Sequence, residues 1–208
     1  MEPIIIDNFL NDQDFNQLCT LNLKKINEDQ ILVYHNQISL TGDIKTECLS
    51  DNVIKELNKN YHKIAISLLE KLNPEKCSLY EYSEFHIIET GAKYKYPIHD
   101  DIPNKLLSGV VYLKPKTNSG TIFYKNKKGD DKKEIEWKQN RAVFFSRIER
   151  ETWHSYEGDG AQNRIALVYN LMTNNVRKVC ELEKKNYFLT RFRHFINPYL
   201  YRFFKKLI

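Results

Sequence analysis

Three residues have types and spacing that could bind a metal ion. His99 and Asp101 are two positions apart in the segment YPIHDDIP, and His154 lies further along in ETWHSYEGDG. In an extended strand, residues two apart point to the same face, so His99 and Asp101 can act together. Two imidazoles and one carboxylate leave positions open on an octahedral ion, which suits Fe(II) binding a co-substrate and O2, whereas zinc normally prefers a closed tetrahedral shell. The pattern therefore indicates an open iron centre.

A fourth residue, Arg164, could bind an anion near this centre. It follows His154 by ten residues and begins the apolar run RIALVYNL. A guanidinium cannot lose its charge, so an arginine at the start of a buried strand needs an anionic partner. That partner is either a carboxylate of the protein or the carboxylate of a ligand, held by two parallel hydrogen bonds. Together with the three candidate ligands, Arg164 favours the bound ligand.

Two helices are expected before these residues. A short β run at 4–6 precedes a helix that begins at about Asp12, with Asn11 or Asp12 as its cap and Phe15 and Leu18 on its buried stripe. A second helix is predicted over 51–72 because apolar residues recur three or four positions apart and Asn73-Pro74 follows. Its apolar positions are Ile54, Leu57, Tyr61, Ile64, Leu68 and Leu72.

From Ser78 onward the apolar pattern changes to a period of two, which is typical of strands. About eight short strands after two helices predict a mainly β, α+β domain, either a helix-supported sandwich or a jelly roll. The predicted strands are 79–88, 94–99, 106–113, 121–124, 135–137, 142–145, 152–156 and 164–171.

Composition limits the class of protein. The 208 residues are 41% hydrophobic, enough for one domain with a full core. The four cysteines form no CxxC pair, which excludes a zinc knuckle, a thioredoxin motif and a dense disulfide framework, and predicts reduced thiols. No apolar run approaches about eighteen residues, and no positively charged run precedes the apolar part of the N-terminus. We therefore expect a cytoplasmic protein without a membrane span or secretory signal.

The C-terminal segment has a different composition, which predicts a division into a domain over 1–176 and a helical tail over 177–208. Phe188, Phe192 and Phe195 share one helical stripe, and Asn197-Pro198 is expected to end that helix and begin another. The whole chain has a net charge of +5, but after Glu183 there are only basic residues: Lys184, Lys185, Arg191, Arg193, Arg202, Lys205 and Lys206.

The tail allows several partners. Cations beside an aromatic face are typical of a helix at an anionic membrane surface, which would place the protein at the periphery of a membrane. The alternatives for residues 184–208 are packing on the β-domain, a homodimer interface, and nucleic-acid binding through phosphates. Docking or dimerisation is favoured first, the membrane second, and nucleic acid least.

Six segments between about residues 88 and 172 contain these motifs in order: ETGAKYKYPIHDD, LLSGVVYLKP, SGTIFYK, RAVFFS, WHSYEGD and NRIALVYNL. The order of an HxD pair, a distal His and an Arg ten residues later resembles the iron(II) and 2-oxoglutarate-dependent oxygenases, most of all their prolyl 4-hydroxylase-like branch. The resemblance implies a double-stranded β-helix. It also implies that His99, Asp101 and His154 bind iron and that Arg164 binds the distal carboxylate of 2-oxoglutarate.

Other contacts to the co-substrate are less determined. Tyr112 matches a position in the family whose phenol often assists the distal carboxylate, and it can equally be a half-buried strand tyrosine. Some relatives have a tyrosine ten residues before the first histidine, where this chain has Glu89, so Tyr94 or Tyr96 are the candidate substitutes. Asp100 is the rival iron ligand, but adjacent strand residues face opposite sides, so we choose Asp101.

The resemblance implies a dioxygenase that uses Fe(II), 2-oxoglutarate and O2, with ascorbate as an optional reductant. Such an enzyme hydroxylates a C–H bond and releases succinate and CO2. The motifs do not distinguish a small molecule, a glycan or a peptide as substrate. The alternative is a catalytically silent binding or scaffold module of the same fold, attached to a membrane through its tail. The full set of ligand residues and Arg164 favours the enzyme.

Overall fold

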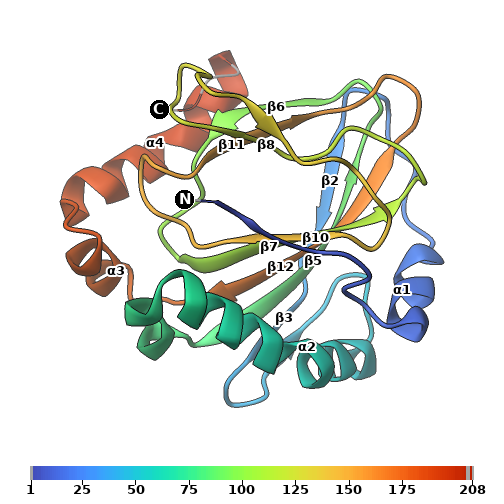
Figure 1. Cartoon of the computed structure of the whole chain (residues 1–208), viewed down its shortest axis with the longest axis horizontal. Helices are drawn as coiled ribbons and strands as arrows, with labels where there is room; N and C mark the ends of the chain where they lie inside the picture. Colours follow the sequence, from blue (N-terminus) through green and yellow to red (C-terminus); the bar gives the residue numbers. More distant parts are fainter. Residues whose placement is uncertain (1, 205–206, 208) are drawn as a thin grey trace.

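Two antiparallel β-sheets lie face to face in the computed structural model, and helices cover the outer face of the larger sheet (Figure 1). The model describes residues 2–204 and residue 207. The larger, eight-stranded sheet has the order β1 (Ile4–Ile6), β10 (Ala142–Phe145), β7 (Lys105–Lys114), β12 (Arg164–Met172), β5 (Tyr82–Thr90), β3 (Gln37–Ser39) and β4 (Ile44–Lys45), with β2 (Ile31–Tyr34) also paired to β5. The four-stranded sheet has the order β6 (Lys95–His99), β11 (Trp153–Glu157), β8 (Ile122–Tyr124) and β9 (Lys133–Glu134).

This arrangement confirms the expected mainly β jelly roll with N-terminal and C-terminal helices. The helix α1 (Asp12–Cys19) begins as predicted, with the Asn11 side chain accepting a hydrogen bond from the Asp14 amide. The helix α2 (Asp51–Leu72) has the predicted bounds and is capped by Ser50. A 3-10 helix, η1 (Pro74–Leu79), connects α2 to β5.

One predicted core position on α2 is wrong. Ile64 is 40% exposed, whereas Ala65 and Leu69 are fully buried. After Tyr61 the next buried residue is Ala65, four positions on, rather than Ile64, three positions on. An α-helix has 3.6 residues per turn, and here the fourth position is the one that faces the sheet.

Alternation along the central strands separates the two faces of the larger sheet. In β12, Ile165, Leu167, Tyr169 and Leu171 belong to the main core, which is shared with α2. The alternate residues, Arg164, Ala166, Val168 and Asn170, line a cavity between the two sheets. The neighbouring β5 has the same alternation, with Thr90 opposite Arg164 and Ile88 opposite Ala166. The period of two thus directs one set of side chains to the helices and the other to the cavity.

The predicted strand at 135–137 is wrong. The strand in this region is β9, which covers only Lys133–Glu134 and pairs with β8. Ile135 and Trp137 are buried because they fill a second, smaller core with Tyr112 and Val143. Their alternation therefore reflects the packing of two apolar side chains just past the end of β9, where the Ile135 amide still donates to the Thr121 carbonyl at 2.9 Å.

The C-terminal segment forms two helices, α3 (Val176–Leu182) and α4 (Tyr187–Phe204), with α4 lying along one end of the sandwich (Figure 1). The predicted break at Asn197-Pro198 is wrong, because α4 continues through Pro198. The helix tolerates the lost backbone hydrogen bond since Arg193 and Tyr201, on either side of the proline, both contact the β-domain. Lys205 and Lys206 lie outside the described residues, and the division of the chain at residue 176 stays a prediction.

Candidate metal centre

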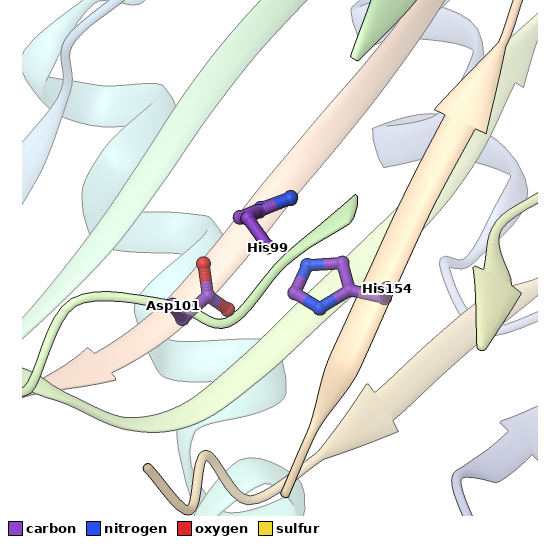
Figure 2. A group of neighbouring side chains, drawn as sticks. All are labelled: His99, Asp101 and His154. Carbon is purple, nitrogen blue, oxygen red and sulfur yellow. The ribbon is translucent and has the colours of Figure 1, made fainter. Parts of the chain in front are cut away.

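The structure brings the three candidate ligands together between the two sheets. His99 ends β6, Asp101 follows two residues later, and His154 lies directly opposite His99 on β11. One ligand atom from each residue lies within 4.8 Å of the others, and Figure 2 shows the three side chains pointing toward a common centre. Among the described residues this is the group whose chemistry fits a divalent transition metal, because it combines two imidazoles with one carboxylate.

Backbone carbonyls fix the orientation of both imidazoles. The Nδ1 atom of His99 lies 3.0 Å from the Pro97 carbonyl oxygen. The Nδ1 atom of His154 likewise lies 3.0 Å from the Thr152 carbonyl oxygen. A carbonyl can only accept, so each Nδ1 carries the hydrogen and donates it. Each Nε2 then keeps a free lone pair, which is the form in which histidine binds metals.

The charges of the site are also those of a metal-binding group. Burial, and next the neighbouring His154, lower the pKa of His99 to about 3, so this imidazole is neutral near pH 7. Burial alone would raise the pKa of Asp101, but Lys105 and the two histidines outweigh it and hold the pKa well below its usual range. A neutral imidazole and an ionised carboxylate need no deprotonation before they bind a cation.

Asp101 has two further partners in the protein. Lys105 Nζ donates to one carboxylate oxygen at 2.8 Å, and Ser108 Oγ donates to the other at 2.6 Å. A carboxylate offers about four lone-pair sites, so both bonds leave room for a metal. Lys105 and Ser108 were not found by sequence reasoning, since a lysine four residues after an aspartate in a loop has no distinctive pattern.

Asp100 faces the other way. Its carboxylate accepts from Arg193 of α4 at 2.8 Å and from the Arg150 amide at 2.8 Å. On the same side, Arg147 Nε donates to the backbone carbonyl of Asp101 at 3.0 Å. The loop that carries Asp101 is therefore held by buried arginines behind the metal centre, while its side chain faces the two histidines.

Arg164 lines the same cavity as the three candidate ligands. This cavity has a volume of about 320 Å³. Arg164 is 4% exposed, and one of its terminal nitrogens donates to the Ser119 carbonyl at 3.2 Å, while its Nε has no hydrogen-bond partner. The ion pairs that arginines form in the described part of the chain involve Arg141, Arg147 and Arg193, but not Arg164.

Aromatic rings partly replace the missing anion. The Arg164 guanidinium carbon lies 4.1 Å from the centre of the Tyr156 ring and 5.1 Å from the Trp137 ring. Burial lowers the pKa of Arg164, although an arginine in a protein keeps its charge. Stacking on the rings leaves the in-plane Nε–H donor unsatisfied, so the arrangement suits a small carboxylate that enters the cavity.

The candidate second contacts to such a carboxylate differ in position. Tyr112 is fully buried and is not among the residues that line the cavity. It stacks on Trp137 and exchanges hydrogen bonds with Thr121, which does line the cavity. Glu89 is not among the residues that line the cavity, because it is on the helix-facing side of β5. Tyr94 and Tyr96 both line it.

Sequence reasoning did not find three further residues that line the cavity. Thr90 faces Arg164 across the β5–β12 ladder, and its hydroxyl lies 3.2 Å from that of Tyr156. The alternation of β5 could have indicated Thr90, and its place two residues after His154 could have indicated Tyr156. Tyr201 reaches the cavity from α4 and lies 2.6 Å from the Tyr94 hydroxyl, a contact that no sequence spacing indicates.

Comparisons of the sequence gave no relative. No family model matches the chain, and no curated protein matches it.

Comparison of the structure identifies the fold. A prolyl-4-hydroxylase from Pseudomonas putida is similar with a TM-score of 0.56 and 13% identity, covering 83% of this chain and 93% of that one. A prolyl hydroxylase from Trichoplax adhaerens, in complex with a hypoxia inducible factor oxygen degradation domain peptide fragment, has a TM-score of 0.53, 16% identity and coverage of 85% and 86%. An oxidoreductase of the 2OG-Fe(II) oxygenase family from Burkholderia pseudomallei has a TM-score of 0.51, 12% identity and coverage of 83% and 85%. The chain therefore has the fold of the prolyl hydroxylases and 2OG-Fe(II) oxygenases, as its motifs predicted.

Proposed function

We propose that the protein is an Fe(II)- and 2-oxoglutarate-dependent dioxygenase that hydroxylates a C–H bond of its substrate. The observation that carries this proposal is the shared cavity, where a His-Asp-His group and a buried arginine without a protein carboxylate lie together. A buried cation without an anion is costly, and a dicarboxylate co-substrate would supply the anion only when bound. The similarity of fold to 2OG-Fe(II) oxygenases supports the same chemistry.

Each residue has a defined role in this proposal. His99 and His154 would hold Fe(II) through Nε2, and Asp101 through a carboxylate oxygen. Arg164 would bind the distal carboxylate of 2-oxoglutarate, with Thr121 and Tyr156 around it and Tyr112 behind Thr121. When bound, iron and 2-oxoglutarate supply the reaction with O2 that yields succinate and CO2 and hydroxylates the substrate.

The rest of the cavity wall would orient the substrate and exclude water. Ile88, Val110, Ala166 and Val168 give the wall an apolar surface, and Tyr94, Tyr96 and Tyr201 form an aromatic part of it. Apolar walls lower the local dielectric and so would strengthen the contact between Lys105 and Asp101 and the contact of Arg164 with the co-substrate carboxylate. The T. adhaerens hydroxylase was solved with a peptide, which makes a peptide one reasonable substrate class to test beside small molecules and glycans.

Anaerobic titration tests whether the cavity binds both groups. The full chain, mixed with Fe(II) and then with 2-oxoglutarate in the absence of O2, should develop a visible charge-transfer band that neither addition produces alone. His154→Ala should abolish the band because it removes one ligand. His35→Ala is the matched control, since His35 is exposed and lies outside the cavity. Absence of the band in the folded wild-type protein would contradict the proposal and favour a silent binding module.

Turnover tests the ligand set itself. We expect His99→Ala and Asp101→Ala to reduce iron-dependent succinate formation to the level of a reaction without protein, because two remaining ligands hold the metal poorly. Succinate can be measured by mass spectrometry with 2-oxoglutarate alone, through uncoupled turnover, and with candidate substrates. Undiminished turnover in either variant would refute the ligand assignment.

A further inference from the structure

The helix α4 has an inner face that is bound to the β-domain. The Thr190 hydroxyl donates to the Glu149 carboxylate at 2.5 Å, and Arg193 forms an ion pair with Asp100 at 2.8 Å. The hydroxyls of Tyr201 and Tyr94 form a hydrogen bond at 2.6 Å. Arg193 follows Thr190 by three residues and Tyr201 follows Arg193 by eight, so at 3.6 residues per turn all three lie on one side of the helix. Thr190 and Arg193 are almost fully buried. The inner face therefore fixes α4 on the domain and determines which side faces solvent.

The outer face of α4 is a row of exposed aromatic residues. Their spacing of three or four residues places them on one stripe, opposite the inner face. Each of these residues has between 57% and 72% of its surface exposed, which is unusual for five aromatic residues on one face of a helix. The stripe consists of Phe188, Phe192, Phe195, Tyr199 and Phe203.

The apolar surface continues from α4 onto the β-domain. Ile102, directly after the candidate ligand Asp101, is 46% exposed. A groove of about 430 Å³ lies between Ile102 and Pro103 on one side and Phe192 and Phe195 on the other, with Arg191 at its wall. The aromatic stripe is thus one part of a broader face that α4 shares with the loop after β6.

The charges beside this face favour one kind of partner. Arg191 and Arg202 are exposed, and at 3.6 residues per turn both fall along the same edge of the stripe. The sequence has no acidic residue after Glu183. Arg193 does not contribute, because it is buried against Asp100. A second copy of this face would place like charges together, whereas an anionic surface would neutralise them.

We propose that the outer face of α4, together with Ile102, binds the surface of an anionic lipid bilayer. The helix would lie in the plane of the interface, with its phenylalanines among the upper parts of the acyl chains and its arginines near lipid phosphates. No helix in the described part of the chain is long and apolar enough to cross a membrane, so the contact is with the surface. This proposal is independent of the reaction in the cavity.

Vesicle flotation with the full chain tests the proposal. Vesicles of phosphatidylcholine mixed with phosphatidylserine should carry the protein upward, and added salt should weaken the binding because charges at a surface are screened. Vesicles of phosphatidylcholine alone should carry much less. Equal binding to both kinds of vesicle, or binding to neither, would overturn the proposal.

Matched variants locate the contact on α4. Phe192→Ser combined with Phe195→Ser should weaken binding by about tenfold or more, since two buried aromatic contacts are lost. Leu40→Ser is the control, because Leu40 is 65% exposed and directly follows β3, which lies beside α2 and away from α4 (Figure 1). Circular dichroism and the thermal midpoint should be unchanged, because none of these side chains is buried.

A second pair of variants tests the charge. Arg191→Gln and Arg202→Gln should each weaken binding by about fivefold. The control pair is Lys55→Gln and Lys63→Gln, which removes two exposed cations from α2. If the full chain is instead a dimer that the two phenylalanine substitutions dissociate, and it does not bind vesicles, the partner is a second copy and the membrane proposal is wrong.

Discussion

Arg164 and Arg147 are both buried, but their surroundings differ. Arg147 is completely buried behind the metal centre, where it pairs with Glu183 at 2.6 Å and contacts Glu149 at 3.5 Å. Arg164 lies in the cavity and is surrounded by two aromatic rings and one carbonyl oxygen. Both side chains are at most 4% exposed, yet one region contains its own anions and the other does not.

The difference distinguishes a structural cation from a ligand-binding one. Glu183 also pairs with Lys76 at 2.6 Å, so one carboxylate joins η1, the end of α3 and the loop after β10. Here both buried cations, Lys76 and Arg147, have a carboxylate of the protein as partner, so we call this the complete group, and Arg147 also holds the loop that carries Asp101. The cavity group is incomplete, because no carboxylate of the described residues forms an ion pair with Arg164. A buried charge that the protein itself does not neutralise is the physical sign of a binding site.

The largest effect should come from breaking the complete group. Glu183→Ala leaves Lys76 and Arg147 as buried cations without their shared carboxylate. Removing one partner of a buried ion pair costs about 3–5 kcal/mol of stability. Urea unfolding should therefore show a free energy of unfolding lower by that amount.

A surface glutamate two positions earlier, on α3, supplies the control. Glu181 forms an exposed pair with Lys178 at 3.4 Å, and Glu181→Ala should change stability by at most about 1 kcal/mol. If the two variants lose equal stability, the group around Arg147 is not a structural element and the contrast with the cavity disappears.

The opposite result is expected in the cavity. Arg164→Met removes a buried cation without a carboxylate, so the free energy of unfolding without co-substrate should stay unchanged or rise by up to about 4 kcal/mol. Binding of 2-oxoglutarate should weaken by roughly ten- to a hundredfold, because a charge-assisted contact worth about 1.5–3 kcal/mol is lost. Isothermal titration with Fe(II)-loaded protein measures the affinity. A strong loss of stability with unchanged affinity would make Arg164 structural.

The fold and the cavity residues could largely be predicted from sequence because both depend on local periodicity. The alternation of β12 indicates that Arg164 and Ala166 share a face, and the HxD spacing does the same for His99 and Asp101. For Arg164 the sequence favoured a bound carboxylate over a carboxylate of the protein only because the three candidate ligands accompany it. Whether the protein supplies the partner depends on which carboxylates the folded chain brings near, and these belong to distant segments.

The structural group behind the metal centre gave no sequence signal. Lys76 and Glu183 are separated by 107 residues, and neither belongs to a motif. Likewise, the basic residues of the tail look equivalent in sequence, but Arg193 is buried against Asp100 while Arg191 is exposed. Proline at position 198 was expected to end the helix, since sequence patterns do not include the tertiary contacts that hold both halves of α4. The partner of a buried charge, the burial of one arginine rather than another, and the continuation of a helix through proline all depend on tertiary packing.

The smallest expected effect is a pH dependence on the side of the complete group. Burial, and next the charge of Arg193, lower the pKa of His194 in α4 to about 4, compared with about 6.5 in an unfolded chain. Above about pH 6.5 His194 is neutral in both states. Below it the unfolded chain binds the proton first, so stability falls as the pH drops from about 6.5 toward 4.

The slope of this fall identifies the residue. One histidine contributes at most about 1.4 kcal/mol for each pH unit, and less where water reaches it. His194→Gln should lack this histidine's contribution to the pH dependence. The difference in unfolding free energy between wild type and variant should therefore change between about pH 6.5 and 4 and stay constant above about pH 6.5. Thermal and urea unfolding at several pH values measure the difference. A difference that does not change with pH would show that water reaches His194 and that α4 is not packed tightly around Arg193. The buried charged residues behind the metal centre would then not extend into this helix.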